Sequence, residues 1–438
     1  MRTEFFELVR QLGRELGSGE TLLCNLHAER SDFVRFNQAR VRQAGSVEQR
    51  YITVSLLSER RQASATLAIA GNGEDLRLAR DALLQLRDAL GALPEDPWLL
   101  INEEVRSTIS ERRGTLPAAE DVVETTIRLA EGLDFVGFYA GGTLYRGFAN
   151  SLGQQNWHEI DTFNFDWSLY RQGDQAVKTS YAGLEWQESA FAAKLKSASE
   201  QPALLERSRK EIAPGEYRAY LGPRALEELL GLLSWGAFSA RVRATKQSPL
   251  LRMEHGEKLA HELTLKENTE EGTAPVFQAE GFVKPAAVTL ISRGTLGSPL
   301  VSPRSAKEYG LATNAANAGE SPASLDLAAG SLEERGVLAA LDTGLYIPNL
   351  WYLNFSDRPA GRVTGMTRFA TFWVEHGRIV APLTPMRFDD SIYRMLGENL
   401  IDLTRERELL LDASTYEERS TSSARLPGAL LRGLRFTL

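Results

Sequence analysis

Two His-Glu pairs are the first candidates for chemistry in this sequence, because a common zinc arrangement sets a glutamate beside metal-binding histidines. In the HExxH form, two histidines four residues apart face one side of a helix and the glutamate activates a metal-bound water. His158-Glu159 has Thr162 in the second position, and His261-Glu262 also lacks the second histidine. The residues around His158 alternate like a strand, so the helix is missing as well. The sequence therefore predicts no metal site at either pair.

The other reactive side chains stand alone along the chain. Cys24 is the single cysteine and lies in an apolar, strand-like run, so we expect a small buried side chain rather than a nucleophile. One cysteine also excludes an intrachain disulfide and any multi-cysteine zinc site. The sequence contains no G-x-S-x-G elbow and no glycine-rich phosphate loop with its lysine. Neither a serine hydrolase nor a nucleotide-binding protein is indicated.

A more informative cluster is Gly365-Met366-Thr367-Arg368, which precedes a short aromatic strand. A glycine at the entrance of a strand lets another backbone approach closely. Thr367 and Arg368 would then present a hydroxyl group and a guanidinium group beside that approach. Two interpretations stay open: a tight turn with a surface arginine, or the wall of a groove that holds a peptide backbone by strand addition.

Composition is that of an ordinary globular protein and argues against several classes. The 438 residues are 43% hydrophobic and 25% charged. No apolar run approaches the roughly 18 residues that cross a bilayer, so we expect no membrane segment. The N-terminal stretch has the period of an amphipathic helix and not of a signal peptide, which favours a cytoplasmic location. A net charge of −8 with scattered arginines argues against a nucleic-acid partner.

The elements that must position these residues follow an α+β order. Alternating segments between residues 20 and 70, separated by short polar or glycine-containing breaks, predict strands. More strands are expected before the last helix of this half. Helices are expected at residues 73–93, 117–133 and 188–212. This order predicts an N-terminal domain of residues 1–213, in which helices pack on an antiparallel sheet.

The second half of the chain predicts a β-rich C-terminal domain of residues 214–438. The boundary falls near the Ala-Pro-Gly sequence at residues 213–215. The domain opens with a strand, a Gly-Pro turn and a helix that begins at Arg224. Residues 264–331 are rich in glycine, proline and serine, which predicts irregular β structure with long loops.

Four segments in order resemble the TldD/PmbA family, once described as modulators of DNA gyrase and now understood as metalloproteases and their partners. Residues 33–68 resemble the family's N-terminal sheet, and YRGFANSLG at 145–153 resembles its "ANS-x-G" strand and turn. IAPGEYRAYLGPRALEELL at 212–230 resembles the entry to the C-terminal domain. VTGMTRFATFWVEHGRIVAPLTPMRF at 363–388 resembles its closing motif. The order and spacing of the four segments carry the resemblance, which runs through nearly the whole chain.

The resemblance implies the family's fold and raises a question about its chemistry. In the catalytic branch, the helix that opens the C-terminal domain carries an HExxxH zinc motif, and the closing strand adds a cysteine ligand. The corresponding residues here, 224–243 and 362–374, include no histidine and no cysteine. The chain therefore resembles the non-catalytic PmbA (TldE) branch more closely. By that resemblance we expect no catalytic residue and no metal in this chain, and we expect zinc in a TldD-like partner.

The first functional hypothesis is a non-catalytic, TldE-like subunit of a zinc metallopeptidase. With its TldD-like partner, the chain would enclose a cavity that receives unfolded or extended peptides. We expect two segments to form the groove walls in this chain. They are the Gly365–Arg368 cluster and residues Asn349, Trp351 and Tyr352.

Two alternatives stay open. One is a self-sufficient metal-dependent peptidase with a rearranged site built from His158, His255 or His261 with nearby glutamates. The other is a homo-oligomeric peptide-binding protein, for example a homodimer, that kept the fold and lost the chemistry. Metal analysis would distinguish the first from the second, and measurement of molecular mass in solution would test for the homodimer.

Overall fold

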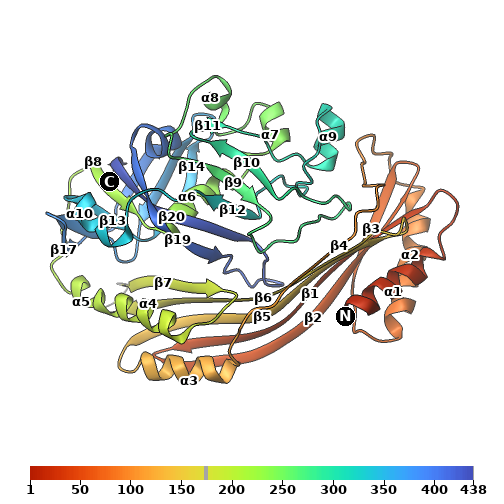
Figure 1. Cartoon of the computed structure of the whole chain (residues 1–438), viewed down its shortest axis with the longest axis horizontal. Coiled ribbons are helices and arrows are strands. Elements are labelled where there is room, and N and C mark those ends of the chain that lie inside the picture. Colours follow the sequence, from red (N-terminus) through yellow and green to blue (C-terminus); the bar gives the residue numbers. More distant parts are fainter. Residues whose placement is uncertain (172–175, 438) are drawn as a thin grey trace.

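The computed structural model describes residues 1–171 and 176–437, and the strands of these residues form two sheets (Figure 1). The first sheet contains seven strands from the first half of the chain, and the second contains thirteen strands from the rest. The first sheet is a long curved ribbon, and the second half of the chain lies over one of its ends. The predicted α+β fold, a helix-covered antiparallel sheet followed by a β-rich half, is confirmed.

The first sheet has the strand order β3-β2-β1-β5-β6-β4, and β7 also pairs with β6. All of its pairs are antiparallel except that of β4 with β6. Its strands are β1 (Thr21–Asn37), β2 (Arg40–Ser58), β3 (Arg61–Ala68), β4 (Thr108–Arg112), β5 (Asp134–Asn150), β6 (Gln155–Tyr170) and β7 (Ala176–Gly183).

The strands of this sheet are longer than the alternation in the sequence predicts. One of the short polar breaks expected between residues 20 and 70 would follow Glu29, but β1 continues through it. The buried Glu29 carboxylate accepts hydrogen bonds from Ser31 Oγ and Gln49 Nε2 (2.8 and 2.6 Å). A paired polar side chain can occupy an interior position without ending the strand. β1 turns into β2 only at Gln38 and Ala39, whose φ angles are 51° and 53°. Two successive positive φ angles are typical of a two-residue hairpin turn.

Helices pack at both ends of the first sheet. α1 and α2 lie at one end, and α3, α4 and α5 at the end that carries the second half of the chain (Figure 1). The expected helix over 188–212 is wrong beyond Glu200, because Pro202 begins a separate short turn. The helices are α1 (Arg2–Gly13), α2 (Glu74–Leu90), α3 (Ala119–Leu129), α4 (Glu188–Glu200) and α5 (Pro202–Leu205).

The second sheet is centred on β20, which pairs with β8, β12, β18 and β19. Its strands are β8 (Gly215–Leu221), β9 (Leu265–Asn268), β10 (Ala287–Ser292), β11 (Thr295–Leu296), β12 (Ser324–Leu327), β13 (Gly344–Ile347), β14 (Leu350–Asp357), β15 (Arg362–Thr367), β16 (Phe372–Glu375), β17 (Arg378–Pro382), β18 (Arg387–Ser391), β19 (Leu400–Leu411) and β20 (Ser423–Phe436).

The helices of the second half are mostly short. The expected helix from Arg224 is confirmed as α6, but it ends at Ser234 because Gly236 has a φ of 106°. The others are α7 (Ala240–Ala244), α8 (Leu251–Glu254), α9 (Pro303–Tyr309) and α10 (Val337–Leu341), with a 3-10 turn at Glu334–Gly336 and a π-turn at Arg394–Glu398. Among the residues that the structure describes, no helix combines the length and the apolar character needed to cross a membrane.

The loop between β19 and β20 makes non-covalent contacts that hold the two halves of the molecule together. From this connection, Arg419 enters the first sheet and is almost completely buried. Its guanidinium donates to Thr162 O and Oγ1 (both 2.7 Å) and to Ser31 Oγ (3.2 Å). A hydrophobic cluster also includes Phe372 together with side chains of the first sheet and its helices. Both contacts hold the second half against the first sheet.

Candidate functional site

A cavity of about 670 Å³ lies where α6 faces the first sheet. Strands β5, β6 and β7 contribute Phe138, Asp166 and Lys178 to its lining. The β19–β20 connection contributes residues 412–414 and 422, the start of β20 contributes residues 423–424, and β14 contributes Leu353. The cavity therefore exists only because the two halves of the chain meet, and its walls come from segments far apart in the sequence.

Helix α6 separates this cavity from the core of the second half. Pro223 occupies its first turn, where a missing N–H costs no hydrogen bond. Its apolar residues are buried at helical spacing: Ala225, Leu226, Leu229, Leu230, Leu232 and Leu233. The polar residues that it contributes to the cavity include Arg224, Glu227 and Glu228, with Gly231 one turn further on. The amphipathic pattern of α6 thus places charged side chains at the cavity.

Ion pairs hold the charged wall in place. The Arg224 guanidinium lies 2.7 Å from Glu227 Oε2 and 3.2 Å from Asp166 Oδ1, and it also donates to Ser180 Oγ. Burial raises the pKa of Glu227, although Arg224 acts in the opposite direction. Burial also raises the pKa of Glu228, against the effect of Lys178. Both carboxyl groups therefore take up a proton more readily than a solvated glutamate does.

No zinc ligands meet at this cavity in the residues that the structure describes. The residues that line it include neither histidine nor cysteine. Throughout residues 1–171 and 176–437, no group of three or more His, Cys, Asp or Glu is placed to hold a metal. A catalytic zinc site requires about three protein ligands and an open position. The side chains present therefore do not fit a zinc ion, and we derive no step through one.

The histidines named for a rearranged site belong to no metal-binding group among the residues that the structure describes. His158 is buried in the first sheet, where Nε2 lies 3.0 Å from Thr273 O. His255 and His261 are exposed on the second half. Cys24 is buried in the core under α1 and α2, and burial raises the pKa of its thiol. These positions lend no support to a self-sufficient metal site.

Of the expected groove residues, Trp351, Tyr352 and Arg368 lie together, but none of the expected set lines the cavity itself. Thr367 does not present its hydroxyl group, because it is buried and Thr367 Oγ1 accepts a hydrogen bond from Met386 N (2.9 Å). The Arg368 guanidinium stacks 4.0 Å above the Trp351 ring, and the rings of Trp351 and Tyr352 lie 5.4 Å apart. Asn349 Nδ2 donates to the backbone oxygen of Lys178 (3.1 Å), the same residue whose side chain lines the cavity. Trp351 and Tyr352 are 41% and 76% exposed. These aromatic rings therefore remain available to a ligand.

Strand β15 does not offer an edge for strand addition. It pairs with β14 through Trp351↔Met366 and with β18 through Met366↔Arg387, so both of its edges are occupied. Gly365 is explained by packing, since a Cβ there would lie 2.7 Å from the buried Phe388 ring. The expected single strand over 362–374 is also divided, at Phe369 with a φ of 62°. Within the described part of the chain, β14 pairs only with β15, so the free edge beside the groove is that of β14.

A second hollow of about 360 Å³ lies on the first sheet next to the cavity. Phe138 lines both spaces. The Phe33 and Phe138 rings stack 6.1 Å apart, and the Arg35 guanidinium lies 5.5 Å from the Phe138 ring. Thr415 of the β19–β20 connection lines the far side. The two hollows thus adjoin at Phe138 on the first sheet.

Sequence reasoning did not identify the charged residues of the cavity. Asp166 and Lys178 lie on strands that alternate without any distinguishing motif, so nothing in the sequence marks them. Arg224 and Glu227 do share a helical face at i, i+3 spacing opposite the leucine stripe. That pattern indicates a polar surface of the helix, but it does not reveal that the surface meets Asp166.

Comparison with known proteins gives the class of the fold. The structure resembles TldE from Thermococcus kodakarensis with a TM-score of 0.81 at 14% identity, covering 99% of this chain and 100% of that one. It resembles a protein from Thermotoga maritima described as a candidate modulator of DNA gyrase, with a TM-score of 0.77 at 14% identity over the full length of both chains. A similarly described protein from Bacteroides thetaiotaomicron has a TM-score of 0.76 at 15% identity over 99% of each chain. The fold is thus that of TldE and the gyrase-modulator proteins.

The sequence itself supplies the family. Residues 214–438 match the model of the PmbA/TldA metallopeptidase C-terminal domain, which is more than half of the chain. No curated protein matches the sequence. The chain belongs to the TldD/PmbA family.

Proposed function

We propose that this chain is a non-catalytic, TldE-like subunit of a zinc metallopeptidase, and that it holds an extended peptide in the α6 cavity. The observation that carries the proposal is the composition of that cavity. The helix that would supply zinc ligands in a catalytic relative presents Arg224, Glu227 and Glu228 instead, and Arg224 is engaged with Asp166. A wall of paired charges can orient a polar ligand but cannot activate a metal-bound water.

The shape and chemistry of the surroundings favour a peptide as the ligand. The cavity and the adjoining hollow share Phe138, whose ring stacks on that of Phe33 in the hollow. The free edge of β14 offers backbone donors and acceptors beside Trp351 and Tyr352. An extended peptide binds such an edge through its main chain and fills neighbouring pockets with alternate side chains. Catalysis would then require zinc from a TldD-like partner.

Cleavage assays test whether catalysis requires the TldD-like partner. The full chain, purified alone and supplied with zinc, should not cleave an unstructured peptide that is labelled at both ends. Addition of the TldD-like subunit from the same source should produce cleavage that a chelator abolishes. Metal-dependent cleavage by this chain alone, at a rate similar to that of the pair, would contradict the proposal.

Binding measurements with the same peptide test the site. In fluorescence anisotropy, Trp351→Ala and Tyr352→Ala should each weaken binding about tenfold, because exposed aromatic anchors often contribute most of the affinity of a peptide interface. Trp98→Ala removes an aromatic ring that is also exposed (37%) but lies outside both β14 and the cavity, and it should bind as the unchanged chain does. Equal binding by all three variants would place the peptide elsewhere.

A further inference from the structure

Three residues of α6 (Pro223–Ser234) and its C-terminal end form one continuous stripe on the wall of the cavity. Glu228 and Trp235 are seven positions apart, so about two helical turns separate them on the same side of the helix. Both line the cavity, and Gly231 lines it between them. These three residues, which we call the α6 stripe, present a carboxylate, a bare stretch of helix and an indole ring.

Glu228 is a carboxylate of this wall that has no partner. Its neighbour Glu227 lies 2.7 Å from the Arg224 guanidinium. The Glu228 carboxylate, in contrast, forms no hydrogen bond or ion pair in the part of the chain that the structure describes. Lys178 also lines the cavity, but its Nζ lies 5.5 Å from the Phe369 ring and is not paired with Glu228. A cation supplied by a ligand would therefore stabilise the charged form of Glu228.

The rest of the α6 stripe is open. Apart from the backbone of the helix itself, a Cβ added at Gly231 would have no atom within 4 Å, so packing does not require a glycine there. Alanine also favours a helix more than glycine does. Trp235 is 61% exposed although its ring is large and apolar. A carbon chain that lies over Gly231 would cover the helix backbone and bury part of the indole ring.

We infer that the α6 stripe binds a lysine or arginine side chain of the peptide, with the cation at Glu228 and the carbon stem over Gly231 and against Trp235. Basic side chains commonly bury their stems along apolar surface while the charged head keeps a polar environment. The two turns between Glu228 and Trp235 span about 10 Å, which accommodates an extended stem. This inference rests on the proposed peptide-binding function and adds the class of side chain that is recognised.

The overall charge of the cavity favours a cation over an anion. Of the described residues that line it, Asp166, Glu227, Glu228 and Asp412 are acidic, whereas Lys178 and Arg224 are basic. An excess of negative charge in a concave site attracts a cationic group and disfavours an acidic one. A peptide with a basic residue is therefore the ligand that this wall fits.

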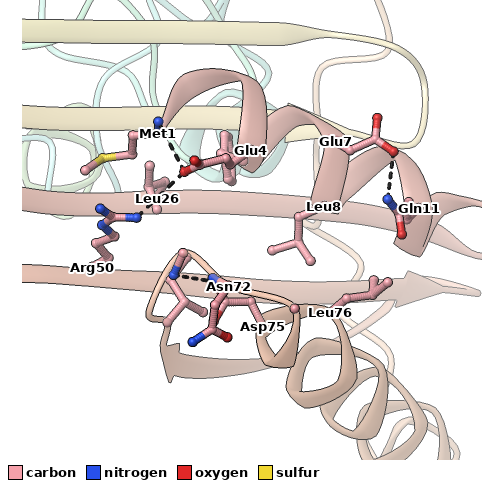
Figure 2. A pocket seen from close by; sticks show the side chains of 14 residues that line it. Met1, Glu4, Glu7, Leu8, Gln11, Leu26, Arg50, Asn72, Asp75 and Leu76 are labelled. Carbon is pink, nitrogen blue, oxygen red and sulfur yellow. Dashed lines mark hydrogen bonds and ion pairs between the residues drawn. The ribbon is translucent and has the colours of Figure 1, made fainter.

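A second cavity of the molecule has carboxylates whose charges are already engaged. It has a volume of about 470 Å³ and lies between α1 and the start of α2 (Figure 2). Glu4 lies 3.7 Å from Arg50, and Glu7 Oε1 accepts a hydrogen bond from Gln11 Nε2 (2.7 Å). Asp75 accepts hydrogen bonds from three backbone N–H groups just before α2. This cavity therefore supplies a control site, in which loss of a carboxylate leaves the α6 stripe intact.

Fluorescence anisotropy with three matched peptides tests the inference. Each peptide is an uncharged, unstructured host with blocked ends and a fluorophore, and it carries lysine, norleucine or glutamate at one central position. The full chain should bind the lysine peptide about tenfold more tightly than the norleucine peptide, because norleucine keeps the stem and lacks the charge. The glutamate peptide should bind most weakly of the three.

Variants of the α6 stripe separate the charge from the stem contact. Glu228→Gln should bind the lysine and norleucine peptides equally, because the carboxylate is gone and the stem contact remains. Trp235→Ala should weaken the binding of both peptides about fivefold, because the stem loses apolar contact. Glu7→Gln removes a carboxylate from the control cavity and should keep the tenfold preference for lysine. Far-ultraviolet circular dichroism verifies that each variant is folded.

The possible results distinguish this inference from the proposed function. Equal binding of the lysine and norleucine peptides by the unchanged chain, or a preference for lysine that survives Glu228→Gln, overturns the inference and leaves peptide binding intact. So does unaltered binding of both peptides by Trp235→Ala. Tightest binding of the glutamate peptide also overturns it and indicates Lys178 as the recognising group. If none of the three peptides binds, both the inference and the proposed function are wrong.

Discussion

His158 shows at the scale of one residue why a histidine beside a glutamate is no indication of a metal. Its Nε2 bonds to Thr273 O, and its Nδ1 is buried with no hydrogen-bond partner among the described residues. Burial and the nearby cations Arg146 and Arg112 lower the pKa of His158 to about 4. In the charged form the second ring proton would lie on Nδ1, which has no hydrogen-bond acceptor nearby among the described residues. The side chain is therefore a neutral part of the sheet core.

This environment predicts a loss of stability in mild acid. The unfolded chain takes up the proton near the ordinary histidine pKa of about 6.5, whereas the folded chain resists it down to about pH 4. Stability is therefore fully present above pH 6.5 and is lost as the pH falls toward 4. At pH 5 the contribution of His158 to this loss should be about 2 kcal/mol. Chemical denaturation at pH 7.5 and pH 5 measures it.

Two variants isolate the histidine from other titrating groups. His158→Gln keeps a donor for Thr273 O but cannot take up a proton, so its stability should vary less between the two pH values. His376→Gln alters an exposed histidine and should leave the profile of the unchanged chain intact. If His158→Gln and the unchanged chain lose the same stability between pH 7.5 and pH 5, burial of a neutral His158 is not responsible.

At the scale of elements, β14, β15 and β18 decide which part of the closing motif can meet a ligand. β15 is the middle strand of the three and is paired on both sides at Met366, so neither edge of the strand is free there. The exposed aromatic residues lie on the outer strand, where Tyr352 has a φ of 57°. A non-glycine residue in the left-handed region carries strain, and such strain is frequent at binding sites. Gly365 is thus explained by packing in the core, whereas the exposed aromatic residues Trp351 and Tyr352 on β14 can contact a ligand.

Substitution of Gly365 tests this division. Gly365→Ala should lower the free energy of unfolding by about 2 kcal/mol, because the new methyl group would overlap the Phe388 ring in a packed core. The combination with Phe388→Leu should cost less than the sum of the two single changes, since the shorter side chain leaves room for the methyl group. Urea denaturation of the three variants measures the coupling.

A matched glycine on the cavity side serves as the control. Gly231 lies in α6 and has open space where a Cβ would be. Gly231→Ala should be neutral or should stabilise the protein by up to about 1 kcal/mol, because alanine favours the helix. If Gly365→Ala proves as neutral as Gly231→Ala, then close packing on Phe388 is not the reason for the glycine.

For the whole molecule, the buried Arg419 forms a polar link between the two halves. It is 5% exposed, and burial lowers the pKa of its guanidinium to about 10. The neighbouring Glu418 lies 2.9 Å from His27 and 3.2 Å from Arg146, both on the first sheet. The α6 cavity depends on this link, since its walls come from both halves.

Removal of Arg419 should loosen the contact between the halves. Arg419→Ala leaves buried acceptors of the first sheet without donors, so we expect a loss of about 3 kcal/mol. Arg419→Lys should recover little, because an ammonium group cannot reproduce the guanidinium fork. Limited proteolysis should cut the β19–β20 connection sooner in both variants. Arg335→Ala removes an 86% exposed arginine and should match the unchanged chain.

Part of this protein was determined by local sequence alone. The alternation of β1, the leucine stripe of α6 and the proline at its start predicted those elements, because each depends on neighbours within a few residues. The ordered motifs likewise indicated the family, and the helix and closing strand lacked histidine and cysteine in the sequence itself. Two local predictions were wrong. β1 continued through the polar Glu29, where a break was expected, and α4 ended at Glu200, before Pro202.

Only the tertiary structure decided which residues meet. Arg224 and Asp166 are 58 positions apart and come together because the second half lies over the end of the first sheet. Arg419 reaches Thr162 across 257 positions. Contacts of this kind depend on how whole elements pack, and no local pattern in the chain encodes their distances. The sequence thus determined the family and the missing zinc ligands, and the packing of two sheets determined the cavity that remains.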